Sequence, residues 1–94
     1  MDAKLKKKWV KALLSGEYKQ GVSMLYSEAN NKWCCLGVLG DVIGFPKDRL
    51  RGGCFLTHKY AVNGMPLRLQ GRLADLNDEG VPFDMIAGLI DGAL

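Results

Sequence analysis

The sequence lacks the features of several common protein classes. No apolar run approaches the ~20 residues that a membrane-spanning helix needs. The lysine-rich N-terminal segment also lacks the continuous apolar stretch and small-residue cleavage site of a secretory signal. We therefore expect a cytoplasmic protein with no membrane partner. The phosphate-binding patterns Gly-x-x-x-x-Gly-Lys-Ser/Thr and Gly-x-Gly-x-x-Gly are absent as well, so the 12 glycines are assigned to turns and tight packing.

Cysteine and histidine are scarce, which limits metal and redox chemistry. Three cysteines, two of them adjacent, do not suit a disulfide framework, and no Cys-x-x-Cys pair exists. Cys54 and His58 have a spacing that suits a zinc site or a nucleophilic pair, so a Cys/His metal-dependent enzyme is kept as a third hypothesis. We favour the opposite interpretation, in which at least one of Cys34 and Cys35 packs beside Trp33 as a small apolar group. Neither a metal nor another cofactor is then expected.

A strong excess of charge of either sign is also missing. The chain has 13 Lys and Arg residues and 10 Asp and Glu residues, a net charge of +3, which permits an acidic partner without requiring one. Hydrophobic residues make up 48% and charged residues 24% of the 94 residues, as in a globular chain. We expect one domain over residues 1–94.

The first third of the chain predicts a helix followed by a hairpin. Residues 4–14 place apolar side chains at spacings of three and four on one face and lysines on the other. Gly16 suits the end of this helix, because glycine adopts the left-handed conformation without steric cost. Residues 22–27 and 32–33 are expected to form the two arms of a hairpin around the turn at 29–31.

The apolar segment 34–43 could be a buried strand or a buried helix. Its length and the spacing of Cys35, Leu39 and Ile43 favour a helix, although each glycine inside it costs ~1 kcal/mol relative to alanine. We assign a helix, in which the small residues allow a neighbouring backbone to approach closely. Residues 47–64 are expected to be irregular.

Two further helices are predicted near the C-terminus, on either side of a break at 77–80. Pro66 and Pro82 each suit the first turn of a helix, and apolar residues recur at helical spacing after both. The predicted fold is a single α+β domain with three to four helices packed on a short antiparallel β-hairpin. Its expected core consists of Trp9, Leu13, Leu25, Trp33, Leu36, Leu39, Ile43, Leu73, Leu76, Phe83 and Ile86.

Basic side chains provide an alternative function, nucleic-acid or nucleotide binding. The C-terminal helix–break–helix outline resembles a helix-turn-helix, but its second helix carries Asp84 and Asp91 and no Arg, Lys, Gln or Asn for base contacts. We therefore do not expect direct DNA reading by this unit. The basic face is instead assigned to Lys4, Lys7, Lys8 and Lys11, with Arg49 and Arg51 adding charge elsewhere.

Three motifs in order resemble a family of short bacteriophage and prophage proteins. A Trp-containing helix ends in Ser-Gly-x-Tyr-x-Gln-Gly at 15–21, Cys-Cys-Leu-Gly-Val occupies 34–38, and Leu-Asn-Asp-x-Gly at 76–80 precedes Phe-x-x-Ile-Ala at 83–87. The resemblance implies an origin in the cytoplasm of an infected or lysogenic bacterium and brings no catalytic or cofactor residue with it. It also implies a protein that binds and blocks a host factor, such as a defence complex or its nucleotide signal.

The leading hypothesis is therefore a non-enzymatic binding module that inhibits a host protein or defence complex. Residues 15–21 form a polar connector, and loops on a rigid scaffold commonly carry contacts. In the opposite interpretation, Tyr18 and Gln20 only hydrogen-bond the hairpin beneath. The chain is expected to be a monomer or a homodimer. The candidate contact residues, whose convergence on one cleft would support the hypothesis, are Glu17, Tyr18, Gln20, Arg49 and Arg51.

Overall fold

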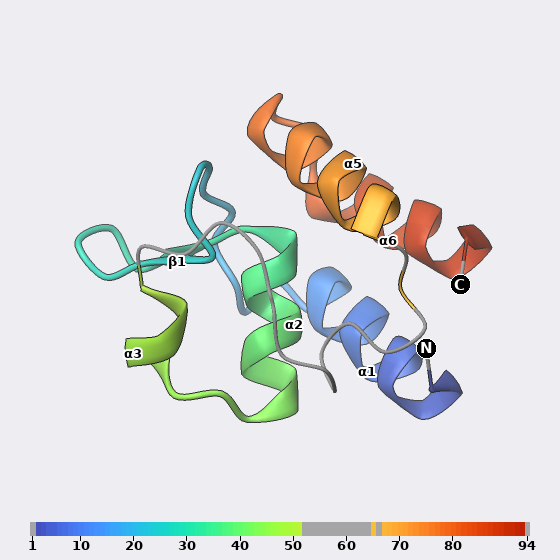
Figure 1. The fold of residues 1–94 in the computed structure, drawn as a ribbon, viewed down its shortest axis with the longest axis horizontal. Coiled ribbons are helices and arrows are strands. Elements are labelled where there is room, and N and C mark those ends of the chain that lie inside the picture. Colours follow the sequence, from blue (N-terminus) through green and yellow to red (C-terminus); the bar gives the residue numbers. More distant parts are fainter. Residues whose placement is uncertain (1, 52–64, 66, 94) are drawn as a thin grey trace.

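The computed structural model describes residues 2–51, 65 and 67–93. These residues form five helices and a two-stranded antiparallel sheet, which confirms the predicted α+β class (Figure 1). The elements are α1 (Ala3–Leu14), β1 (Tyr26–Ser27), β2 (Lys32–Trp33), α2 (Cys35–Ile43), α3 (Lys47–Leu50), α5 (Leu67–Asp78) and α6 (Phe83–Ala93). Helix α2 contacts α1, α5, α3 and β2, and α1 also packs along α6. None of the helices in the described ranges is both long enough and apolar enough to cross a lipid bilayer.

Helix α1 begins and ends as the sequence predicts. The Asp2 side chain caps its N-terminus by accepting a hydrogen bond from the Leu5 backbone N–H (3.2 Å). Gly16, with φ +77°, follows its last turn. Trp9 and Leu13 are buried on the inner face, and the Trp9 indole N–H donates to the Cys35 carbonyl of α2 (2.9 Å). This bond satisfies the one polar group of a fully buried side chain.

The hairpin is shorter than the sequence predicts. Tyr26 pairs with Trp33 and Ser27 with Lys32, so only the last two residues of the predicted arm at 22–27 are a strand. Ser23 has φ +71°, a left-handed conformation that interrupts extended structure. The predicted turn is confirmed, and Asn31 in it has φ +51°.

Helix α2 is the centre of the core, and it shows why a glycine lies inside a helix. A side-chain carbon on Gly37 would lie 1.7 Å from the Leu25 carbonyl oxygen, so only glycine lets this backbone approach. All residues from Cys35 to Gly40 are buried, which confirms the assignment of a buried helix. Gly44, with φ +98°, ends it.

The structure corrects the prediction that residues 47–50 are irregular. These residues form the one-turn helix α3 and bury Leu50 (1% exposed). The segment lacks the apolar periodicity of a longer helix, and its single buried leucine gives no pattern to recognise. The remainder of the predicted irregular segment, including Cys54 and His58, lies outside the described residues.

The break between the C-terminal helices is narrower than the predicted 77–80, because α5 continues to Asp78 and Gly80, with φ +90°, lies in the turn that follows. The apolar residues that recur at helical spacing after Pro82 form the buried face of α6, and they are Phe83, Ile86, Ala87 and Ile90. Most of the predicted core is buried, but Ile43 and Leu76 are only half-buried. Ile43 is the last residue of α2, where fewer neighbours cover a side chain than at the middle of a helix.

Candidate binding surfaces

A polar junction, in which Gln20 is half-buried and Asn77 is fully buried, joins the connector at 15–21 to the C-terminal helices. The Gln20 side-chain amide donates to the Asn77 side-chain oxygen (3.1 Å) and to the Val81 carbonyl (2.6 Å). Its own oxygen accepts from the Phe83 backbone N–H (3.2 Å). One glutamine therefore pairs with groups at the end of α5 and at the start of α6.

Asn77 extends the same junction to α2. Its side-chain oxygen accepts from the Cys35 backbone N–H (3.1 Å), and its amide nitrogen donates to the Gly21 carbonyl (2.7 Å). Asn77 is 0% exposed, so these bonds form in a medium that strengthens them. Among the described residues, no buried side-chain nitrogen or oxygen lacks a hydrogen-bond partner.

The junction explains what the three sequence motifs have in common. Gln20 and Gly21 come from the first motif, Cys35 from the second and Asn77 from the third, and they meet here through the hydrogen bonds above. Residues of the motifs that carry the resemblance therefore hydrogen-bond one another and hold distant parts of the chain together. They bring no reactive group to the surface at this point.

Tyr18 and the connector backbone also have internal partners. The Tyr18 hydroxyl donates to the Asp41 carboxylate of α2 (2.5 Å), and its ring meets the Trp33 ring edge-to-face at 5.3 Å. Burial, followed by the hydrogen bond to Asp41, raises the pKa of Tyr18 to about 12, so the phenol is neutral at physiological pH. The connector backbone bonds the hairpin through Gly21 N–H to Trp33 O (2.7 Å) and Trp33 N–H to Lys19 O (2.8 Å).

Residues 15–25 form a loop that the junction leaves partly exposed, and this loop is here called the connector loop. Val22 is 54% and Met24 is 44% exposed, and Glu17 and Lys19 are exposed as well. The backbone of the loop is held between these two apolar residues and directly after them. Ser23 N–H donates to the Asp78 carboxylate (2.8 Å), and the buried Leu25 accepts from the Cys34 N–H (3.1 Å).

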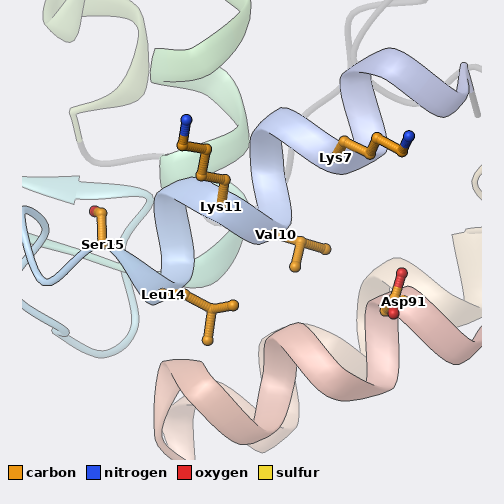
Figure 2. Close-up of a pocket in the computed structure, with 6 residues that line it drawn as sticks. All are labelled: Lys7, Val10, Lys11, Leu14, Ser15 and Asp91. Carbon is orange, nitrogen blue, oxygen red and sulfur yellow. The ribbon is translucent and has the colours of Figure 1, made fainter.

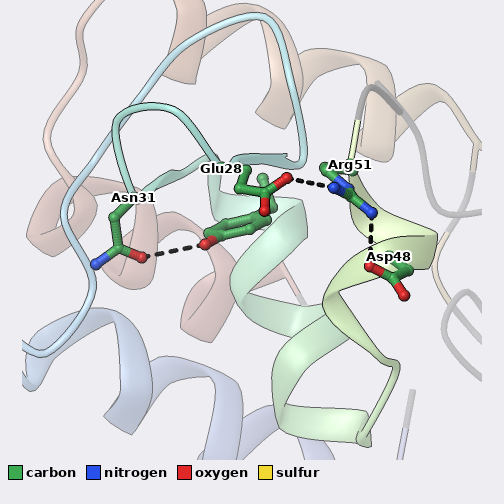
Figure 3. Close-up of polar contacts among 5 residues, drawn as sticks. Glu28, Asn31, Asp48 and Arg51 are labelled. Atoms are coloured by element: carbon green, nitrogen blue, oxygen red, sulfur yellow. Dashed lines mark hydrogen bonds and ion pairs between the residues drawn. The ribbon is translucent and has the colours of Figure 1, made fainter.

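Arg51 and Arg49 lie on or beside α3, away from the partners of Gln20. Arg51 pairs with Glu28 in the hairpin turn and with Asp48 (2.6 Å), as Figure 3 shows. The hydrogen bond to Glu28 raises the pKa of Arg51. Arg49 is exposed. Tyr18, Gln20 and Arg51 thus have different partners, and Arg51 ties α3 to the hairpin.

The predicted basic face is exposed, and a pocket lies beside it. Lys4, Lys7, Lys8 and Lys11 are all exposed on α1. A pocket of about 420 Å³ lies between α1 and α6, with Val10 and Leu14 pointing into it from α1 (Figure 2). Its lining is Lys7, Val10, Lys11, Leu14, Ser15 and Asp91, which includes none of the five predicted contact residues.

The adjacent cysteines are core residues, as predicted. Cys34 is 4% and Cys35 is 0% exposed, and the Cys35 thiol lies 3.6 Å from the Leu73 carbonyl. Burial, followed by the neighbouring Cys34, raises the pKa of the Cys35 thiol, so this group is protonated at neutral pH. The Cys34 sulfur accepts from the Gly37 N–H (3.4 Å) and so caps α2. Over residues 2–51, 65 and 67–93, no three His, Cys, Asp or Glu side chains are grouped as a metal site requires.

These features define a small α+β domain with a closed core, a braced apolar loop and a lysine-faced helix. The chain belongs to the family described as Domain of unknown function (DUF8296), whose model matches residues 1–64. That range contains Gln20 and Cys35 but not Asn77, their partner in the junction. No curated protein and no solved structure matches the chain.

Proposed function

We propose that this chain is a non-enzymatic binding module that recognises another protein through its connector loop. The observation that carries the proposal is the exposure of Val22 and Met24 on a loop whose backbone is held between these residues and directly after them. A loop already fixed by the core loses little conformational freedom on binding, so more of its contact energy is available for affinity. Methionine also adapts its shape to a partner surface.

The polar residues of the loop complement this apolar centre. Glu17 and Lys19 are exposed on the same loop and provide charges of both signs. An apolar centre with a polar rim is the usual anatomy of a protein–protein interface. Under this proposal Tyr18 and Gln20 are positioning residues, because their side chains brace the loop from within.

The partner we propose is a host protein, bound in the cytoplasm of a bacterium that carries a phage or prophage. The resemblance of the three motifs to short phage proteins supports this choice, and the weak net positive charge permits an acidic target. Binding would block the host protein, which is the kind of action that the resemblance implies.

A pull-down from bacterial lysates tests the proposal. The wild-type chain should recover a stoichiometric protein, and the variant Val22→Ser/Met24→Ser should lose it without a change in thermal stability. Leu89→Ser, which removes a similarly exposed side chain from α6 (48%), is the matched control and should retain the partner. Recovery of no partner, or equal recovery by the loop variant, would sink the proposal.

Nucleic-acid binding is the second candidate, because four lysines of α1 are exposed together. Binding of a DNA or RNA duplex through them should weaken steeply with salt, with a slope that falls when Lys7 and Lys11 are replaced by glutamine. Absence of binding at low salt would dismiss this candidate.

A further inference from the structure

We propose that the face formed by α1 and α6 binds a second copy of this chain through a two-fold symmetric interface. This proposal goes beyond the function above and does not depend on the connector loop. It is carried by the distribution of apolar and charged side chains over the two helices.

The apolar part of the proposed face lies on α1. Leu14 of α1 is 57% exposed on this face. Met85 (61%) and Leu89 (48%) are exposed on α6 but lie on another side of that helix from Asp84 and Asp91, because of the 3.6-residue period. Leu14 and Val10 also form the apolar part of the pocket between the two helices (Figure 2). Exposed and half-buried apolar side chains that line a pocket, such as these two, commonly mark an interaction surface.

The positive charges on this face lie on α1 and the negative charges lie on α6. On α1 the exposed charged residues are Lys4, Lys7, Lys8 and Lys11, whereas α6 carries Asp84 and Asp91 and has no Lys or Arg at all. Within one chain, only Lys6 of α1 forms an ion pair with α6, to Asp91 (3.8 Å), in the part that the structure describes. The face is thus basic on one side and acidic on the other.

A two-fold axis along the groove between the helices brings these opposite charges together. The Lys6–Asp91 pair places the start of α1 beside the end of α6. Rotation by 180° about this axis does not shift residues along the helix direction. It therefore lays α1 of one copy over α6 of the other, with the start of α1 beside the end of α6. Lys7 and Lys11 then face Asp91 and Asp84 of the second copy, and each pairing occurs twice, as in an isologous dimer.

The outer side of α6 also leaves room for another helix. Gly88 and Gly92 are exposed, and a side-chain carbon built on either would meet nothing within 4 Å. Glycine at such positions lets a second backbone approach closely. The same face suits a phosphate backbone less well, because Asp84 and Asp91 would repel it.

Charge reversal tests the proposed dimer by analytical ultracentrifugation. The wild-type chain should self-associate to twice its monomer mass. Lys7→Glu/Lys11→Glu should weaken self-association roughly tenfold or more, and so should Asp84→Lys/Asp91→Lys, because each sets like charges against each other. An equimolar mixture of these two variants should regain the dimer, since each then meets opposite charges on the other, and so should the chain that carries all four changes.

Three further measurements complete the test. Lys19→Glu/Lys32→Glu changes the net charge equally at exposed sites outside the face, and this control should remain dimeric. Val22→Ser/Met24→Ser should also remain dimeric, so the dimer can stand if the loop proposal fails. If a charge variant does not fold, Leu14→Glu replaces it and should yield a folded monomer. A wild-type chain that stays monomeric, or a mixture that does not restore the dimer, would overturn the proposal.

Discussion

Gly37 shows how a single residue can decide the packing of this fold. The position without a side chain lets the connector-loop carbonyl of Leu25 rest against α2. Glycine lowers the stability of the helix by about 1 kcal/mol relative to alanine. The packing of the connector loop on the core, which the close approach allows, offsets this loss.

Gly37→Ala is therefore expected to destabilise the protein by about 3 kcal/mol or more, since backbone atoms must move to admit the methyl group. Gly71→Ala in α5 is the matched control, because a side-chain carbon there meets nothing within 4 Å. The control should gain up to about 1 kcal/mol. Denaturant unfolding of both variants measures the difference, and equal stabilities would contradict the contact.

The two buried cysteines lead to a prediction about reactivity. In a Cys54→Ser background, Cys34 and Cys35 should react slowly with a thiol reagent in the native state and fast in denaturant. Burial both blocks access and raises the pKa of the Cys35 thiol, which removes the reactive thiolate. Stoichiometric labelling of the folded protein within the mixing time would contradict the assignment of these residues to the core.

At the scale of elements, the junction around Asn77 joins α2, α5 and the connector loop. Asn77→Ala leaves the Cys35 N–H and the Gly21 carbonyl without their partner in a buried site. We expect a loss of about 3 kcal/mol in the free energy of unfolding, because unsatisfied buried polar groups each cost on the order of 1–3 kcal/mol. Asn30→Ala, at an exposed position of the hairpin turn, should change stability by less than about 0.5 kcal/mol. Thermal or urea unfolding distinguishes the two variants.

Tyr18 links the connector loop to α2 and predicts a dependence on alkaline pH. Its pKa is raised to about 12 in the folded protein, above its ordinary value of 10, so the folded state holds the phenolic proton more tightly. The resulting stabilisation is fully present below pH 10 and is lost as the pH rises from about 10 to about 12.

Tyr18→Phe should cost about 2 kcal/mol at pH 7, because it removes a hydrogen bond to a carboxylate. The difference in stability between wild type and variant should shrink between pH 10 and 12, as measured by urea unfolding at each pH. Taking this difference cancels the titration of groups common to both proteins. A difference that stays constant with pH would show that the hydroxyl does not bind Asp41 in the folded protein.

At the scale of the whole molecule, the N-terminal and C-terminal parts depend on each other. Helix α1 packs more extensively on α6 than on any other described element, and Gln20 hydrogen-bonds Asn77 of α5 and Phe83 of α6. The family match covers only residues 1–64, yet these residues complete their core with α5 and α6.

A fragment of residues 1–64 is therefore expected not to fold cooperatively. Its tryptophan emission should be red-shifted relative to the full chain, because Trp9 and Trp33, 0% and 5% exposed in the full chain, lose part of their cover. Fluorescence and thermal melts of the fragment and the full chain give the comparison. A sharp melt of the fragment would indicate that residues 1–64 are a domain on their own, against the expectation of one domain over 1–94.

The sequence by itself determined the class of fold, the helices at 4–14, 34–43 and near the C-terminus, and the packing of at least one of Cys34 and Cys35 in the core. These features depend on local signals: apolar periodicity, helix-ending glycines and proline positions, which act over a few residues. The sequence also showed that the lysines of the first helix share one face, because the 3.6-residue period of a helix determines where each residue lies around its axis.

Only the tertiary structure decided which polar residues meet. The pairing of Gln20 with Asn77 spans 57 positions in the sequence, and no local pattern relates them. The same holds for the α1–α6 face, where Leu14 and Asp91 line one pocket. Such contacts are fixed by how helices pack, because packing maximises burial over the whole core while hydrogen bonds must be satisfied wherever burial places them.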